Sequence, residues 1–174
     1  MTIRIATPDD AALLHDVAAE TFPLACPPHT TRESIDAFIA ENLSEQSFAG
    51  YLADPQRQLF VAMADGVAIG YTMVVHGEPK DADVAAAVTS RPTAELSKVY
   101  VRSQHHGGGI ARQLVEVSVA AAAARGAVSV WLGVNQENER ANAFYEKCGF
   151  RRVGTKKFLV GERYEDDFVR ALEL

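Results

Sequence analysis

Three consecutive glycines, Gly107, Gly108 and Gly109, separate the apolar stretch 98–101 from an alanine-rich stretch that begins at Ile110. The first stretch has the β-branched and aromatic residues of a strand, and the second has strong helix propensity. A plain turn rarely needs more than one glycine, because each glycine costs conformational entropy on folding. A helix N-terminus with bare backbone is a ready anion site. We therefore expect this loop to hold an anionic group.

The two common phosphate-binding loops do not fit this stretch. A P-loop needs a lysine followed by serine or threonine after its last glycine, and no lysine lies near this loop. A dinucleotide fingerprint that starts at Gly107 would require a glycine where Arg112 stands, and no second βαβ unit follows. Two interpretations remain: another class of phosphate-binding loop, which we favour, or a glycine-rich turn that only joins a strand to a helix.

The composition bounds the classes of protein that remain. With 48% hydrophobic and 23% charged residues in a chain of 174, we expect one folded domain over residues 1–174. A net charge of -6 argues against a general affinity for nucleic acid or anionic membrane. The first ten residues lack the pattern of a signal peptide, and no apolar run is long enough to cross a bilayer. We expect a cytoplasmic location.

Cysteine and histidine give no sign of a metal centre. The two cysteines, Cys26 and Cys148, fit neither a zinc spacing nor a disulfide framework, and we expect both to be reduced. The five histidines show no spacing typical of a zinc site. We predict no bound metal.

The hydrophobic pattern predicts an α/β fold. Asp65 and Gly66 form a tight turn between two apolar runs, which is typical of a β-hairpin over 58–75. A first helix follows Thr7 and Pro8 and is expected to run to about Glu20, before a segment with three prolines. The other expected helices are 32–43, 44–54 with a cap at Ser44, one of about 16 residues that ends at Gly126, and 138–148; residues 81–88 are a loop or a short helix. The other expected strands are 3–6, 94–101, 128–134, 150–160 and 164–174, of which the last two form an antiparallel pair.

Two motifs resemble the GCN5-related N-acetyltransferase (GNAT) family. The residues His106, Gly107, Gly108, Gly109, Ile110 and Ala111 match that family's pyrophosphate loop, [RQ]-x-x-G-x-[GA], except that histidine stands at the first position. The later segment 131–150 matches the family pattern N-x-x-A-x-x-x-Y-x-x-x-G-F at Asn138, Ala141, Tyr145, Gly149 and Phe150. Asn138 also suits a helix cap, and Tyr145 lies two turns further on the same helix face.

The resemblance implies a fold and a co-substrate. It implies a mixed, mostly antiparallel sheet of about seven strands that is splayed at a groove for acetyl-CoA. The pantetheine arm would lie between the strands 98–101 and 131–134 and pair with backbone around Val99, Tyr100 and Val101. The pyrophosphate would meet the amides of residues 106–111, with Asn138 and Tyr145 nearby. Exposed sheet edges in this fold often pair, so a homodimer is an open expectation.

The resemblance also implies a reaction. The family transfers an acetyl group directly from acetyl-CoA to an amine, without an acyl-enzyme. Tyr145 would be the general acid toward the coenzyme sulfur, and Glu95 matches the base of the histone-acetylating branch. Binding of substrate and a solvated strand end are the alternatives for Glu95. The backbone N–H of Val101 would polarise the acetyl carbonyl.

The acceptor follows from a closer resemblance. Segments along most of the chain, among them 19–22, 94–101, 131–150 and 156–174, are similar to PaiA-type spermidine/spermine N-acetyltransferases. A polyamine groove needs carboxylates, and the candidates are Glu20, Glu41, Glu165 and Asp166. The alternatives are an acetyltransferase for a protein N-terminus, a lysine or a drug amine, and a non-catalytic acetyl-CoA sensor. Retention of both Tyr145 and Glu95 weighs against the sensor.

Overall fold

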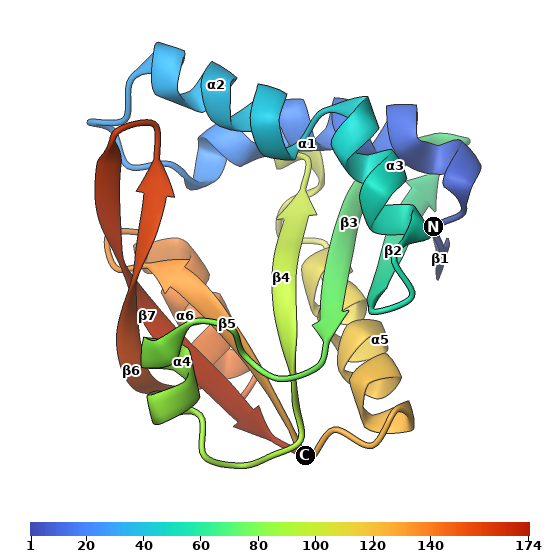
Figure 1. The fold of residues 1–174 in the computed structure, drawn as a ribbon. Coiled ribbons are helices and arrows are strands. Elements are labelled where there is room, and N and C mark those ends of the chain that lie inside the picture. Colours follow the sequence, from blue (N-terminus) through green and yellow to red (C-terminus); the bar gives the residue numbers. More distant parts are fainter.

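A computed structural model describes residues 1–174 as one seven-stranded sheet flanked by helices (Figure 1). The helices are α1 (Ala11–Ala25), α2 (Arg32–Asn42), α3 (Glu45–Ala53), α4 (Ala82–Ala87), α5 (Ile110–Ala124) and α6 (Glu139–Lys147), with short 3₁₀ turns at Pro8–Asp10 and Ser103–His105. The strands are β1 (Thr2–Ile5), β2 (Arg57–Ala64), β3 (Val67–His76), β4 (Thr93–Val101), β5 (Ser129–Asn135), β6 (Arg151–Val160) and β7 (Arg163–Glu173).

The strand order is β1-β2-β3-β4-β5-β7-β6. Every neighbouring pair is antiparallel except β4 and β5, which are parallel. This arrangement confirms the predicted α/β class and the mixed, mostly antiparallel sheet. The crossover from β4 to β5 runs through the glycine loop and α5, as a parallel connection requires.

Several local predictions are confirmed. The β2–β3 hairpin turns at Asp65 (φ 51°) and Gly66 (φ 76°), and both residue types tolerate this left-handed region. Ser44 caps α3 by accepting a hydrogen bond from the Ser47 amide at 3.0 Å. Residues Ala82–Ala87 form the short helix that the sequence left open, and β6 and β7 form the closing pair.

The first helix is longer than predicted. It continues past Glu20 to Ala25 and contains Pro23 in its last turn. Pro23 removes one helical hydrogen bond, but the extension buries Thr21 and Phe22 and stacks Phe22 on Phe38 of α2 at 4.5 Å between ring centroids. Packing therefore outweighs the proline, and the extra turn brings the end of α1 over the sheet.

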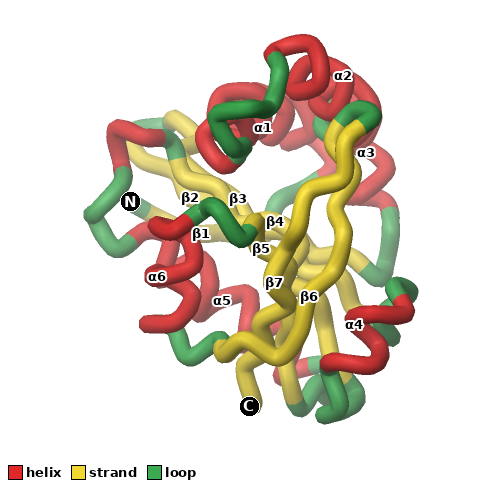
Figure 2. The backbone as a smooth tube through the Cα atoms, turned by 90° about the vertical axis from the view of Figure 1, so that its left-hand side faces the viewer, coloured by secondary structure: helices red, strands yellow, loops and turns green.

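The helices cover both faces of the sheet (Figure 2). The apolar side of α5 packs on β2, β3 and β4, and α6 lies on this same face. The opposite face is covered by α1, α2 and α3 over β2 and β3, and by α4 beside β5 and β7. The space over β4, β5 and β7 between these helices is where the polar side chains described below gather.

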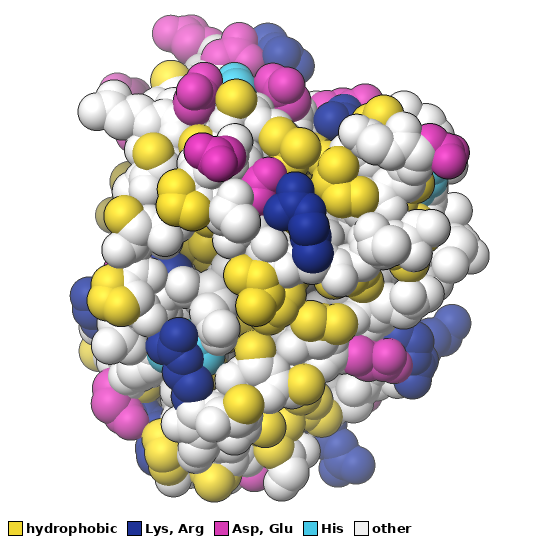
Figure 3. Space-filling model, turned by 90° about the vertical axis from the view of Figure 1, so that its right-hand side faces the viewer, with side chains coloured by type: hydrophobic (Ala, Val, Ile, Leu, Met, Phe, Trp, Pro, Cys, Tyr) yellow, Lys and Arg dark blue, Asp and Glu magenta, His cyan; other side chains and the backbone are white.

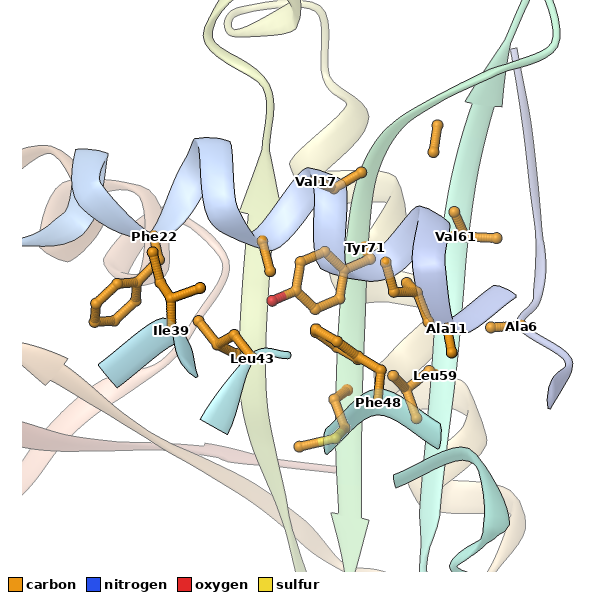
Figure 4. Packing of buried hydrophobic residues seen from close by; sticks show 14 of the residues in the cluster. Ala6, Ala11, Val17, Phe22, Ile39, Leu43, Phe48, Leu59, Val61 and Tyr71 are labelled. Atoms are coloured by element: carbon orange, nitrogen blue, oxygen red, sulfur yellow. The ribbon is translucent and has the colours of Figure 1, made fainter. Parts of the chain in front are cut away.

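The largest core cluster lies under α1 and α3 (Figure 4). Tyr71 of β3 is fully buried there, and its ring meets Phe48 of α3 edge-on at 5.6 Å and lies 5.8 Å from Tyr100 of β4. Leu14 and Val17 of α1 are fully buried in the same cluster. This core fixes the height of α1 above β4.

The surface on the side of β1 and β2 mixes charges of both signs. Basic side chains there are scattered among acidic and hydrophobic ones and do not form one patch (Figure 3). None of the helices combines the length and the apolar character needed to cross a bilayer.

Candidate active site

The parallel strands β4 and β5 diverge soon after they begin. Their pairing covers Thr93, Ala94 and Glu95 of β4 and ends at the pair Glu95–Trp131. Beyond that pair the strands separate toward α1 (Figure 1). A cavity of about 450 Å³ fills the gap, and its wall includes both strands, the start of α5, α6 and the end of α1. The sheet is therefore split by a groove that reaches from one face to the other.

The groove exposes an unpaired edge of β4. Arg102 donates its amide to the Ile69 carbonyl of β3, so the alternation of a strand turns the backbone groups of Val99 and Val101 toward the groove. The Nε2 atom of the His106 ring lies 2.7 Å from the carbonyl oxygen of Val101 and forms a hydrogen bond with it. The amide of Val101 is left on this open edge. Val99 and Val101 both line the cavity.

The glycine loop places backbone without side chains at one end of the groove. Gly107 (φ 84°) and Gly109 (φ 80°) adopt the left-handed region, which explains why glycine stands at both positions. Gln113 makes the first helical bond, to the Gly109 carbonyl, so the amides of Ile110, Ala111 and Arg112 precede it. The side chain of Ile110 is buried in the core, and only its backbone faces the loop. The wall of the cavity includes Gly107 and Gly109 but not Gly108.

Helix α6 forms the facing wall. Asn138 caps it by accepting a hydrogen bond from the Ala141 amide at 3.1 Å, so this side chain serves the helix and borders the groove at once. Tyr145 also lines the groove, and its ring packs edge-on against Phe150 at 6.0 Å. Burial raises the pKa of the Tyr145 phenol far above its usual value, so the hydroxyl keeps its proton at physiological pH.

Glu95 faces a second, smaller cavity. The β3–β4 ladder slips between Leu96 and Lys98, which leaves Ser97 as a β-bulge. The bulge returns Lys98 to the face that carries Glu95, and both border a cavity of about 100 Å³ under α1 and α2. Burial raises the pKa of Glu95. Burial also lowers the pKa of Lys98, to about 8, against the opposing pull of Glu95.

The sequence did not identify Asp167 of β7, which borders both cavities. Its side chain is buried, with 5% of the residue exposed. The nearest cation is Lys156 of β6, whose Nζ lies 3.7 Å from Oδ2. Burial raises the pKa of Asp167 to about 6, although Lys156 opposes this shift. Glu165, Asp167 and Val169 share the buried face of β7, but three consecutive acids in the sequence give no signal for which of them is buried.

Gly133 of β5 makes room for this pair. A Cβ there would lie 2.7 Å from Cε of Lys156 and 3.1 Å from Oδ2 of Asp167. The carboxylate therefore rests directly on the β5 backbone, at the point where β5 has left β4.

The proline-rich segment after α1 crosses the mouth of the site. His29 of that segment places Nε2 at 2.7 Å from Oε1 of Glu165 in β7, and Nδ1 at 3.7 Å from Glu137. Phe38 of α2 lies 5.5 Å from Phe158 of β6. These contacts hold α1 and α2 against the β6–β7 hairpin and close the side of the groove.

The other predicted acids do not enter the groove. Glu20 forms an ion pair with Arg102, Glu41 is exposed on α2, and Asp166 forms an exposed ion pair with Lys157. Of the four proposed acceptor carboxylates, only Glu165 lines the cavity. Tyr145 and Glu95 are brought to neighbouring cavities, and Tyr100 borders both.

A family model described as the acetyltransferase (GNAT) family matches residues 14–150, which include β4, the glycine loop and α6. The chain belongs to the GNAT family. It is therefore an N-acetyltransferase that uses acetyl-CoA as its acyl donor.

Curated relatives and solved structures agree with this membership. Uncharacterized N-acetyltransferases of Mycobacterium tuberculosis and Mycobacterium bovis are 45% identical to this chain over 165 residues, which cover 95% of the chain and 98% of each relative. The PaiA N-acetyltransferase of Thermoplasma acidophilum, solved with coenzyme A, has a TM-score of 0.77 at 20% identity and covers all of both chains. A ribosomal-protein-alanine N-acetyltransferase of Brucella melitensis has a TM-score of 0.67 at 25% identity over the whole of both chains.

Membership in the GNAT family also bears on the cysteines and on metal. Both cysteines are free, and burial raises the pKa of the Cys26 thiol in the groove to about 11. Cys26 is thus a poor nucleophile at neutral pH. GNAT enzymes need no metal, so we assign no cation to His29, Glu137 and Glu165, whose ligand atoms lie within 4.8 Å of one another.

Proposed function

We propose that this GNAT enzyme transfers the acetyl group of acetyl-CoA directly to a primary amine in a ternary complex, with residues 1–174 acting as one catalytic domain. The observation that carries the proposal is the end of β4–β5 pairing at Glu95–Trp131, with a cavity of about 450 Å³ beyond it. That opening exposes a strand edge to the donor on one face and buried carboxylates to the acceptor on the other.

The donor lies along β4. The pantetheine amides add to the open edge at Val99 and Val101 as an extra strand would. The pyrophosphate sits at the amides of Gly109, Ile110 and Ala111, where the start of α5 favours negative charge and glycine leaves space. His106 contributes by holding the Val101 carbonyl, so its ring supports the loop instead of replacing the arginine or glutamine usual in the family.

The chemistry uses three groups. The neutral amine attacks the thioester carbonyl and a C–N bond forms. The amide of Val99 on the open edge of β4, instead of the expected Val101, stabilises the oxyanion, because Val101 lies next to the pyrophosphate loop and its amide pairs with the pantetheine arm. The C–S bond then breaks, and Tyr145, which keeps its proton because of its raised pKa, protonates the departing thiolate. Glu95 removes the proton of the ammonium, for which its raised pKa suits it, with water in the smaller cavity as the relay.

Polyamines are the acceptor class that we propose first. Glu165 and Asp167 place buried carboxylates on the acceptor side of the groove, and a polycation supplies the complementary charge. The similarity in fold to the PaiA enzyme supports the same class.

A peptide amine is the second candidate. Lys98 lies in the smaller cavity with no carboxylate within 4 Å, and a polycation would meet this charge at close range. A peptide with a single α-amine brings only one positive charge, so it meets less repulsion from Lys98 than a polyamine does. The Brucella melitensis relative supports this alternative.

Thiol release from acetyl-CoA would test the proposal, with spermidine, spermine, butylamine and an alanine-initiated peptide as acceptors. We expect release with at least one amine and a loss of kcat in Glu95→Gln of about tenfold or more. Release with a polyamine alone would identify the acceptor class. Tight binding of acetyl-CoA without turnover of any amine would refute the proposed acceptors.

A further inference from the structure

Two buried aspartates of this chain have opposite surroundings. Asp10 is 7% exposed and receives hydrogen bonds from both terminal guanidinium nitrogens of Arg4, Nη1 at 2.8 Å and Nη2 at 2.9 Å, and from the Thr7 amide at 2.7 Å. Its pKa is lowered to about 2, chiefly by Arg4. Asp167 is equally buried, but its one ion-pair partner, Lys156, stands at 3.7 Å, beyond hydrogen-bonding distance.

A buried carboxylate without close donors is costly, and proteins normally supply partners. Here the closest donor, Lys156, stands 3.7 Å away and makes no hydrogen bond to the carboxylate. The β5 residue beneath the carboxylate is Gly133, which brings no side chain, and Glu165 on the same strand is already bonded to His29. The carboxylate faces the groove and the smaller cavity, so a bound molecule can reach it from either one.

Resting on the proposed function, we propose that Asp167 is the counter-ion of the acceptor ammonium, and that Lys156 partly neutralises it when no acceptor is bound. The acceptor nitrogen then lies beside the open end of the β4–β5 split, where the donor's acetyl group arrives. Asp167 is thereby a residue that binds and selects the cationic acceptor, while Glu95 removes the proton.

Other charged groups around Asp167 influence the pH at which its carboxylate is ionised. Lys156 of β6 favours the ionised form, while Glu165 and Asp166 of β7 disfavour it, and burial disfavours it most. Glu95, Lys98 and Tyr100 of β4 border the same small cavity. Since the pKa of Asp167 is raised to about 6, the carboxylate is ionised above that pH and becomes neutral below it. Acceptor binding through Asp167 is therefore retained at pH 8 and lost as the pH falls through about 6.

The test measures acceptor binding in the absence of turnover. The enzyme is saturated with coenzyme A, and spermidine, butylamine and the alanine-initiated peptide are titrated by calorimetry at pH 8. Asp167→Asn keeps the shape and removes the charge, and we expect it to weaken binding of the preferred amine about tenfold or more. Asp166→Asn is the matched control. It removes a carboxylate from the adjacent residue of β7, but the Asp166 carboxylate is exposed and paired with Lys157. The control is expected to bind within about twofold of the native enzyme.

A second variant separates charge from structure. Lys156→Met removes the cation that favours ionisation of Asp167, so the pH at which acceptor binding is lost should move upward. A purely structural role for the pair would leave that midpoint unchanged.

Each outcome bears on the proposal. Equal amine binding by Asp167→Asn and the native enzyme, with coenzyme A affinity intact, would overturn the role of Asp167 and leave the proposed acetyl transfer standing. Failure of all three amines to bind the native complex would overturn both proposals. Weaker amine binding in Asp167→Asn, together with an upward shift in Lys156→Met of the pH at which amine binding is lost, would support Asp167 as the counter-ion of the acceptor.

Discussion

The two ends of the groove are built differently. The proposed donor end consists of backbone from two short segments, the glycine loop at 106–111 and the open edge of β4, with α6 as a wall. The proposed acceptor end consists of side chains from α1, α2, β4, β6 and β7, which lie far apart in the sequence. A backbone site tolerates many sequences provided that glycine and the helix start are kept. A site made of side chains changes its preferred acceptor whenever a charged residue is substituted. This difference suits a fold in which the donor stays the same and the acceptor varies.

Replacing Tyr145 with phenylalanine tests the proposed acid at the point where the donor and acceptor ends of the groove meet. We expect this variant to have the largest effect on kcat. Loss of the phenolic proton donor is expected to lower kcat by about 100-fold, because the thiolate must leave unprotonated. Affinity for acetyl-CoA should change little, since the ring and its packing on Phe150 remain. Steady-state kinetics and calorimetry check this, and an equal loss of both quantities would contradict a role as the acid.

Gly109→Val tests whether the donor end is a backbone site. The φ of 80° at this position is strained for a β-branched residue, and the strain should raise the Kd for acetyl-CoA about tenfold while kcat at saturation stays near normal. Gly126→Val is the matched control, because Gly126 has φ 92° in equally open space at the other end of α5. That variant should lose thermal stability but not coenzyme affinity. Weakened coenzyme binding in both variants would point to general destabilisation.

The donor end could be predicted from sequence for a physical reason. Positive φ at Gly107 and Gly109 and the cap at Asn138 depend on residues close in the chain, so their patterns are local. The end of α1 could not be predicted, because the packing of Phe22 on Phe38 outweighs the proline signal. The acceptor end also depended on long-range pairing. Lys156 and Asp167 meet only through the β6–β7 register, and the bulge at Ser97 decides which residues share a face with Glu95.

Gly133→Ala tests whether the position of the Lys156–Asp167 pair affects the acceptor side alone. The added methyl group would meet Cε of Lys156 at 2.7 Å and Oδ2 of Asp167 at 3.1 Å, so the pair must shift. We expect the KM for the amine to rise about fivefold, with the Kd for acetyl-CoA unchanged. Initial rates at saturating acetyl-CoA measure the first quantity. A rise in the coenzyme Kd alone would place Gly133 in the donor site and break the division between the two ends.

His29→Gln should have the smallest effect. The substitution removes the partner of Glu165 at the mouth of the acceptor side, where His29 is partly exposed. A single hydrogen bond from a partly exposed side chain contributes modestly, and glutamine can replace it in part, so we expect a change of about twofold in the amine KM and none in coenzyme binding. A tenfold change in the amine KM would instead make the segment after α1 a principal determinant of acceptor choice.

The groove passes through the sheet, with α5 and α6 on one side and α1 on the other. In the proposed arrangement each substrate has its own entrance, and neither occupies the other's route. Binding order need not be compulsory in such an enzyme, so double-reciprocal plots should intersect and dead-end analogues of either substrate should bind the free enzyme. If the proposal holds, the acetylated amine and free coenzyme A should depart independently, and a slow acceptor should not trap the coenzyme.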